Sequence, residues 1–442
     1  MRANLSEITQ KVILMTCFIK AGPEFGVDTR VNSIQTNPAV SGLASGGFVL
    51  TWTDNDHLLD ASGGPDVKAQ IYSAAAEPIG DEFLVNTETI DYQCDAKVAG
   101  LAAGGFAVVW QDFSGRRGDE CGSSIKAKVF GPDDELARDE FLVNVETGDN
   151  QTDPTVAAFP DGSFVVAWQD FSGTRGDDSL GSVKARFFGP DGIPFGDEFL
   201  VNTQTKNHQG QPAAAVVAAG GFIIAWNDFS GTFGDFSQGS IKAKLFNREG
   251  ETVRDEFLVN SLKRNNRSLP AVSALEDGGF VIAWTDGSGT LGDSSITSIK
   301  ARLFDDLAVP LSDEFLVNTE TMNCQIRPAL APLADGGFIV VWTDHSGRGG
   351  DISGSGIKGK IFGPQGKTIQ DEFLINTETD GDQISPAVAG LVDGQLVVSW
   401  QDASSSRGVP VRRGEFPCAT IKAQVFTPTD NAIGCAYQKP RL

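Results

Sequence analysis

A loop rich in oxygen-bearing side chains occurs five times in the chain with the pattern W-x-D-x-S-G-x-x-G-D. Calcium takes six to eight oxygen ligands, and a glycine-bent loop with two aspartates and a serine offers three or four of them. Each loop is therefore a candidate half site for calcium. The alternative is that the first aspartate caps the loop by accepting backbone N–H bonds, with no ion bound. The candidate ligands are Asp112, Ser114, Asp119, Asp170, Ser172, Asp177, Asp228, Ser230, Asp235, Asp286, Ser288, Asp293, Asp344, Ser346 and Asp351.

The seventh copy of this loop departs from the pattern. It reads "WQDASSSRGVPVRRGEFPCATIK", six residues longer than a typical copy, and it places Arg407, Arg412 and Arg413 together on an acidic protein. We take these three arginines as candidate ligand-binding residues. A second loop, N-T-E-T-x-x-x-Q-x-x-P, also recurs, with Arg267 replacing its glutamine once.

These loops are positioned by a repeat of 58 residues, because each of the seven tryptophans follows the last at that spacing. Each unit contains four short apolar or alternating runs separated by Gly, Pro, Asp and Ser, which is typical of strands and turns. Seven four-stranded units predict an all-β, seven-bladed β-propeller over residues 26–427. Residues 1–25 are an N-terminal segment and residues 428–442 a C-terminal tail.

Ring closure follows from the ends of the repeat. The stretch "GVDTRVN", residues 26–32, resembles the fourth strand of a unit but precedes the first unit, and the seventh unit lacks a fourth strand. We therefore expect an N-terminal strand to complete the last blade. In a propeller, the loop between the second and third strands and the loop between blades emerge on the same face, so both repeated loops should share that face.

The repeat positions also predict the core. Phe164, Val166 and Trp168 should lie on one face of a second strand and Val165 and Ala167 on the other, with both faces covered by neighbouring blades. We interpret the tryptophans as core between blades rather than as sugar-stacking platforms. A lysine in the third strand and a glutamate in the fourth recur as well. We expect cross-strand pairs on partly exposed outer strands, worth about 0.2 to 1 kcal/mol each.

The charge and hydrophobicity of the chain disfavour some classes of binding partner. The formal net charge is -23, with 58 acidic and 35 basic residues, which disfavours nucleic acid and anionic lipid surfaces. The apolar stretch Val12–Ile19 is far shorter than a membrane span needs, so no transmembrane helix is expected. With Arg2 and Lys11 before it, the same stretch is compatible with a poor signal-peptide core, although Glu7 argues against that interpretation.

The six cysteines are too sparse for a disulfide scaffold. Cys94 and Cys121 lie in two loops of one repeat and are the most plausible disulfide. Cys17 with Cys435 and Cys324 with Cys418 are further possible pairs. No spacing typical of a zinc site is present.

At "DEFLVNTET...Q..PAVA.L.DGGFVV.W.D" the chain resembles the propeller-like repeats of large bacterial secreted proteins of the RTX, or hemolysin-type calcium-binding, and adhesin class. The resemblance covers residues 28–426 and implies an extracellular or cell-surface location. The chain lacks the "GGxGxD" array that carries calcium in that class. It also lacks the "SxDxGxTW" box of sialidase propellers and the "DxDxDG" cage of integrin-type propellers.

Near-identical repeats supply like residues, whereas an active site needs unlike ones at one place. The sequence shows no catalytic constellation. We expect a binding or adhesion module that uses its repeated acidic loops, with calcium as a possible cofactor and a polysaccharide or cell-surface partner held through avidity. The alternatives are a polysaccharide hydrolase or lyase that uses the divergent seventh loop, and a structural scaffold.

Overall fold

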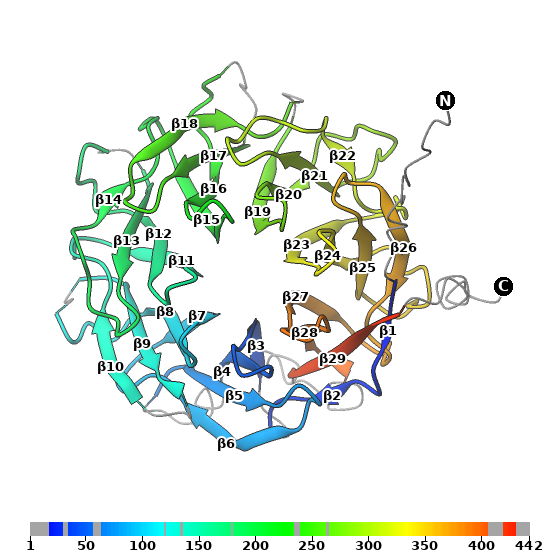
Figure 1. Ribbon diagram of the computed structural model, residues 1–442, viewed down its shortest axis with the longest axis horizontal. Helices are drawn as coiled ribbons and strands as arrows, with labels where there is room; N and C mark the ends of the chain where they lie inside the picture. Colours follow the sequence, from blue (N-terminus) through cyan, green and yellow to red (C-terminus); the bar gives the residue numbers. More distant parts are fainter. Residues whose placement is uncertain are drawn as a thin grey trace, which may run out of the picture.

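Seven small antiparallel sheets stand around a central opening (Figure 1). The computed structural model describes residues 17–29, 34–55, 63–118, 121–132, 136–177, 180–233, 239–261, 265–404 and 419–429. Within these residues there is no α-helix, and none is long and apolar enough to cross a membrane. The all-β, seven-bladed β-propeller predicted from the 58-residue period is confirmed.

Each blade has four strands, which follow one another from the channel outward. The first three blades are β3 (Gln35–Gly42), β4 (Phe48–Asp54), β5 (Asp66–Tyr72) and β6 (Pro78–Leu84); β7 (Gln93–Gly100), β8 (Phe106–Asp112), β9 (Ser124–Phe130) and β10 (Leu136–Leu142); and β11 (Gln151–Ala158), β12 (Phe164–Asp170), β13 (Ser182–Phe188) and β14 (Phe199–Leu200). The next three are β15 (Gln209–Val216), β16 (Phe222–Asp228), β17 (Ser240–Phe246) and β18 (Thr252–Leu258); β19 (Arg267–Ala274), β20 (Phe280–Asp286), β21 (Ser298–Phe304) and β22 (Phe315–Leu316); and β23 (Gln325–Pro332), β24 (Phe338–Asp344), β25 (Gly356–Phe362) and β26 (Thr368–Leu374). The seventh contains β27 (Gln383–Gly390), β28 (Leu396–Asp402) and β29 (Thr420–Thr429), with β1 (Cys17–Lys20) and β2 (Phe25–Gly26) on its outer edge.

The second strand of each blade is buried on both faces because neighbouring blades cover it. Phe164, Val166 and Trp168 pack with residues of the preceding blade, and Val165 and Ala167 pack with residues of the following blade. All seven tryptophans are fully buried. Each such side chain removes about 150 to 250 Å² from water, so the ring of tryptophans is core, as expected.

The last blade is completed by residues from the N-terminal part of the chain. β29 pairs with β28 on one edge and with β1 and β2 on the other, with Phe25 opposite Ala423. The Val27 N–H donates to the carbonyl oxygen of Ile421 at 2.8 Å, as Val201 does to Val183 in the third blade at 2.9 Å. Glu24 therefore begins the fourth-strand motif, two residues earlier than the expected stretch 26–32.

The sheet of the last blade extends beyond the predicted propeller boundaries. It begins at Cys17 rather than at residue 26 and continues to Thr429 rather than to residue 427. Residues 30–32 of the expected closing strand lie outside the described residues.

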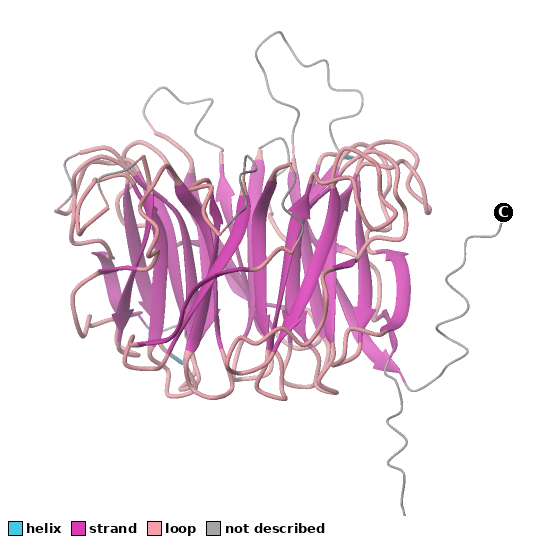
Figure 2. Ribbon diagram, turned by 90° about the horizontal axis from the view of Figure 1, so that it is seen from above, coloured by secondary structure: helices cyan, strands magenta, loops and turns pink. Residues whose placement is uncertain are grey.

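The long loops gather on one face of the ring, at the top of Figure 2. Loops from adjacent blades are joined there by hydrogen bonds: the Ser123 N–H donates to Asn150 Oδ1 at 3.1 Å, and the Ser355 N–H donates to Asp382 Oδ1 at 3.0 Å. In these two blades, the loop between the second and third strands is therefore hydrogen-bonded to the loop that enters the next blade.

The two cysteines of the second blade that were expected to pair are not joined. Cys94 is a free thiol in the inner strand β7, so the Cys94–Cys121 disulfide is not formed. Cys121 precedes Gly122, whose backbone approaches Asp149 and Asn150 of the next blade. Cys17 is disulfide-bonded, and its expected partner, Cys435, lies outside the described residues, as does Cys418.

Asp28 marks the closing seam, because six blades carry an asparagine at its position: Asn86, Asn144, Asn202, Asn260, Asn318 and Asn376. Its Oδ1 accepts the Ile421 N–H at 2.7 Å. Burial raises the pKa of Asp28 to about 6, and although the Ile421 hydrogen bond opposes the rise, the Glu82 and Asp54 carboxylates add to it.

We predict that Asp28→Asn raises the melting temperature at pH 7.5 and leaves it nearly unchanged at pH 4. The folded pKa lies above the unfolded value of about 3.9, so the folded state binds the proton more tightly and stability falls as pH rises from about 4 to 6. Thermal melts at both pH values test this, with the exposed Asp306→Asn as control. Equal melting of Asp28→Asn and the native protein at pH 7.5 would contradict it.

Candidate functional site

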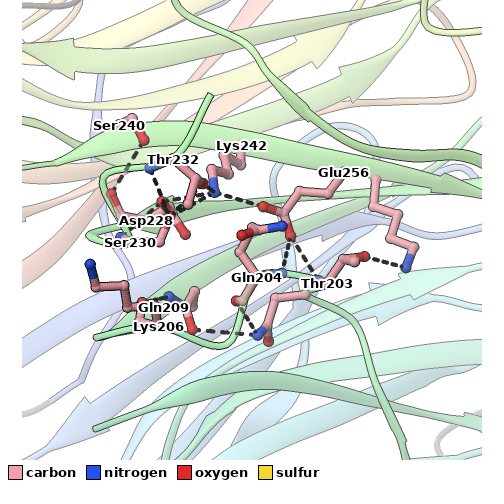
Figure 3. A network of polar contacts seen from close by, with 12 residues as sticks. Thr203, Gln204, Lys206, Gln209, Asp228, Ser230, Thr232, Ser240, Lys242 and Glu256 are labelled. Atoms are coloured by element: carbon pink, nitrogen blue, oxygen red, sulfur yellow. Dashed lines mark hydrogen bonds and ion pairs between the residues drawn. The ribbon is translucent and has the colours of Figure 1, made fainter. Parts of the chain in front are cut away.

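The first aspartate and the serine of the repeated loop contact a lysine ammonium buried inside the blade. In the fourth blade, Lys242 Nζ lies 3.0 Å from Asp228 Oδ1 and 2.6 Å from Glu256 Oε1. It also donates to Ser230 Oγ at 2.9 Å and to Thr232 Oγ1 at 2.6 Å. Figure 3 shows these oxygens converging on the nitrogen from the second strand, the loop and the fourth strand. We call this arrangement the lysine cage.

The lysine cage recurs around the ring, with Nζ to carboxylate oxygen distances of 2.6 to 3.5 Å. The further cages are Lys68 with Asp54 and Glu82, Lys184 with Asp170 and Glu198, Lys300 with Asp286 and Glu314, Lys358 with Asp344 and Glu372, and Lys422 with Asp402 and Glu24. The side chains of Lys184, Lys242 and Lys300 are fully buried. The expectation of partly exposed Lys–Glu pairs is thus wrong for these three blades, whereas the Lys68–Glu82 and Lys422–Glu24 pairs are partly exposed, as expected.

A buried ammonium requires close carboxylates, since an uncompensated charge in the interior costs several kcal/mol. Burial alone would lower the pKa of Lys358, but the Glu372 and Asp344 carboxylates outweigh it and hold the pKa above its ordinary value. In this blade the cage therefore keeps Lys358 charged. The oxygens that we considered as calcium ligands already face a cation, and that cation belongs to the protein.

The second aspartate of the loop contacts a different group. Asp177 Oδ2 accepts from Asn202 Nδ2 at 2.8 Å, and Asp293 and Asp351 accept from the equivalent asparagines at 2.9 and 3.1 Å. The fold therefore divides the expected trio between two networks. Within the described residues, no group of three or more His, Cys, Asp or Glu side chains is arranged to hold a metal ion.

Some candidate residues have no described placement. The residues that lie outside the described part of the chain are Asp119, Asp235, Arg407, Arg412 and Arg413.

The loop serine donates to the first aspartate of its own loop. In the second blade, Ser114 Oγ donates to Asp112 Oδ1 at 2.6 Å. The same serine-to-aspartate bond is present for Ser172, Ser230, Ser288 and Ser346. Calcium binding at these loops remains a prediction.

The caged glutamate also joins adjacent blades. The second oxygen of Glu256 accepts the backbone N–H groups of Thr203 and Gln204, in the strand exit of the preceding blade, at 2.7 and 2.9 Å (Figure 3). Glu198 accepts from Val145 at 2.6 Å, and Glu24 accepts from Thr377 across the closing blade. The repeated acidic residues are thereby used to build the ring.

A second ring of residues does not repeat and lines the central channel. At the third position of every inner strand the chain has a bulge, with φ between 51° and 56°. We call these seven residues the collar: Asn37, Asp95, Asp153, Gln211, Leu269, Arg327 and Ser385. Positive φ is unfavourable for residues other than Gly, Asn and Asp, and β-bulges often re-aim side chains next to functional sites.

Collar residues of adjacent blades contact one another. Asn37 Nδ2 donates to Asp95 Oδ1 at 2.6 Å, and Arg327 Nη1 donates to Ser385 Oγ at 2.9 Å. The backbone of the collar is held by the preceding blade, since the Arg327 N–H donates to Thr285 Oγ1 at 3.1 Å. The collar is therefore a connected set of unlike side chains on a rigid support.

The collar surrounds a pocket of about 430 Å³, also lined by Lys97 and by the prolines that follow most collar residues. Burial raises the pKa of Asp153, and the nearby Asp95 carboxylate adds to the rise while Lys97 opposes it. Asp153 still reaches solvent, so its carboxyl is accessible to a ligand in the channel. Inner strands begin on the face where second strands end, so the pocket lies toward the long loops.

The collar was not among the expected site residues. The repeated motif treats its position as one of two variable residues between the glutamine and the proline. The one signal in the sequence was that this position takes six different residue types in otherwise similar units. Its positive φ could not be expected, because a residue before proline is normally extended.

The fold and the collar define a seven-bladed β-propeller with an asymmetric polar pocket at its axis. No protein-family model matches the sequence, and no curated protein matches it. In fold, the chain is similar to a protein of unknown function from Dyadobacter fermentans DSM 18053, with 11% identity over 93% of this chain and 99% of that one and a TM-score of 0.52. It is also similar to the polysaccharide lyase Uly1, with 9% identity over 93% and 94% of the two chains and a TM-score of 0.50. A puromycin hydrolase mutant is 13% identical over 87% of this chain and 54% of that one, with a TM-score of 0.50. These likenesses show the propeller fold.

We predict that Lys242→Met destabilises the protein by about 3 to 5 kcal/mol, because it leaves Asp228 and Glu256 buried without their cation. The matched control is Lys244→Met on the same strand. Lys244 pairs with Asp255, whose side chain is 65% exposed, so this change should cost at most about 1 kcal/mol. Urea unfolding measures both variants. A similar loss for the two would show that the cage is not a specific source of stability.

We predict that millimolar calcium shifts the melting temperature by less than about 1 °C relative to chelator, because the loop oxygens already hold the lysine ammonium. Calcium bound at several sites would raise it by more, through mass action on the folded state. Differential scanning calorimetry with calcium and with EDTA makes the comparison. A rise of several degrees would support the loops as metal sites.

Proposed function

We propose that the protein is a secreted or surface-exposed binding protein that holds a polar ligand of the carbohydrate class in the collar pocket. The observation that carries this proposal is the collar itself. Seven similar repeats place different side chains at one equivalent position, and these positions converge on one pocket. Unlike polar groups on a rigid scaffold are what specific recognition requires.

The chemistry of the lining favours a hydroxylated ligand. The collar presents two carboxylates, two amides, a guanidinium and a hydroxyl group, with Leu269 as its one apolar member, and proline rings supply further small apolar surfaces. Sugar hydroxyls both donate and accept, so they match such a mixed set of donors and acceptors. One propeller of similar fold, Uly1, is a polysaccharide lyase, which makes a polysaccharide a reasonable partner to test first.

A secreted or cell-surface location is supported by two features. The disulfide at Cys17 suits an oxidising compartment, and the repeats resemble those of RTX-type and adhesin proteins from bacteria. The proposal differs in one respect from adhesion through repeated acidic loops. A single axial pocket engages one chain end or one sugar unit, whereas seven equivalent loops would act by avidity.

Catalysis is the second candidate function, and the Asp95–Asp153 region favours it. A carboxyl with a raised pKa beside a second carboxylate is typical of general acid–base sites in glycosidases and related enzymes. Here the raised pKa of Asp153 arises from burial and from Asp95. Release of reducing ends or unsaturated products from a bound polysaccharide would support a hydrolase or a lyase over a binding protein.

The test is binding to a glycan array by the native protein and by the double variant Gln211→Ala/Arg327→Ala. Hydrogen bonds to charged groups contribute about 1.5 to 3 kcal/mol, so the double variant should lose at least about tenfold in apparent affinity for every glycan bound. Arg348→Ala, an exposed loop residue outside the pocket lining, is the control. Undiminished binding by the double variant would remove the pocket as the site, and no binding by the native protein would favour the scaffold.

A further inference from the structure

Two basic side chains of the collar pocket have no counterpart in the other blades. Lys97 stands two residues after the collar position in β7, where five blades have alanine and one has threonine: Ala39, Ala213, Ala271, Ala329, Ala387 and Thr155. Arg327 is the one basic residue of the collar. Both line the pocket, so the two departures from the repeat bring positive charge to the same place.

Neither base makes an ion pair with an acidic side chain of the described residues, although Lys97 lies near enough to Asp153 to oppose the rise of its pKa. Arg327 uses one guanidinium nitrogen to donate to Ser385 Oγ. In the described part of the chain, neither Arg327 nor Lys97 has a carboxylate oxygen within ion-pair distance. The lysines of the cages, in contrast, each contact two carboxylates. Bases are scarce in a chain with 58 acidic and 35 basic residues, so two bases that share one pocket and make no ion pair point to an anion from outside.

The two bases belong to opposite walls. β7, which carries Lys97, and β23, which carries Arg327, lie across the central opening from each other (Figure 1). An anionic group that enters the channel therefore meets positive charge from two directions. The carboxylates of Asp95 and Asp153 lie on the β7 and β11 side, across the opening from Arg327.

We propose that the collar pocket binds a small hydroxylated carboxylate, of which an acidic sugar is the type, with its carboxylate between Arg327 and Lys97 and its hydroxyls toward Asp95 and Asp153. This inference rests on the proposed function and names the ligand class for the same pocket. Arginine suits the role because its planar guanidinium donates two parallel bonds to a carboxylate.

Asp153 is compatible with an anionic neighbour. Burial and Asp95 already raise the pKa of its carboxyl, and an anion in the pocket raises it further. In the proposed arrangement the hydroxyls of the ligand, and not its carboxylate, lie toward Asp153, so a neutral side chain at this position removes a negative charge near the ligand. Asp153→Asn, which places in the third blade the residue found at Asn37, should therefore hold or tighten the binding of the carboxylate.

The net charge limits the size of the ligand. A protein of formal charge -23 repels polyanions over about one Debye length, or about 8 Å at physiological salt. An anionic ligand is attracted only close to Lys97 and Arg327. The pocket therefore suits one charged unit, free or at the end of a chain, rather than an uninterrupted polyanion.

The test is isothermal titration of the full chain with four probes: glucuronate, glucose, glucosamine and inorganic phosphate. We expect glucuronate to bind at least tenfold more tightly than each of the others. Lys97→Ala and Arg327→Asn should each reduce this preference to within about threefold. Both variants carry a residue that another blade has at the same position, so they should fold, and circular dichroism melts verify that they do. Arg348→Gln is the control and should bind as the native protein does.

The remaining outcomes separate this inference from the function on which it rests. Glucose bound as tightly as glucuronate, or a preference that survives both variants, overturns the carboxylate while leaving a sugar pocket. Phosphate bound as tightly as glucuronate shows a general anion site and overturns the ligand class. No binding of glucose, glucuronate or glucosamine overturns both.

Discussion

The buried lysine ammonium is the interaction on which the ring depends. Its carboxylate partners come from the end of the second strand and from the fourth strand, so one charge joins the middle and the edge of a blade. The glutamate then accepts backbone N–H groups of the preceding blade. A charge buried without these partners would cost several kcal/mol. One lysine cage therefore holds the end of the second strand, the loop, the fourth strand and the contact with the preceding blade in place.

This use of the acidic residues determines where recognition takes place. The loop residues that repeat most faithfully are engaged by cages and asparagines, and their oxygens point inward. The collar residues take no part in the cages. They lie on the inner strands, where the side chain faces the channel and the backbone is held by the preceding blade. The scaffold is therefore nearly symmetric, whereas the pocket is asymmetric, because the collar position takes six residue types in the seven blades.

The number of blades and their buried apolar faces can be predicted from the sequence. The buried polar contacts cannot. The spacing of Trp168 and Trp226 with their relatives sets the blade number, and the alternation around Trp168 sets both buried faces. Cross-strand spacing correctly pairs Lys242 with Glu256 but carries no information on depth. The pair is covered by the loop before β17 and contacts the preceding blade, and the spacing of Lys242 and Glu256 indicates neither.

The other differences between the sequence predictions and the structure also arise from contacts that the sequence does not show. Asp170 and Asp177 stand seven residues apart and look like partners, but Lys184 and Asn202 divide them between two networks. The closing strand was expected from a resemblance between short segments, and its register depends on Glu24 meeting Lys422. The collar depends on bulges that pattern and propensity do not reveal.

The closing blade has a consequence for the order of assembly. Glu24 and Lys422 are separated by 398 positions, whereas the strands inside each of the other blades are close neighbours along the chain. Contacts of such long sequence separation form slowly, because a large loop must close first. During synthesis the segment that contains β1 and β2 emerges first and finds its partner strand last. Until β29 is made, the six preceding blades form an open arc, with one apolar blade face exposed at each end.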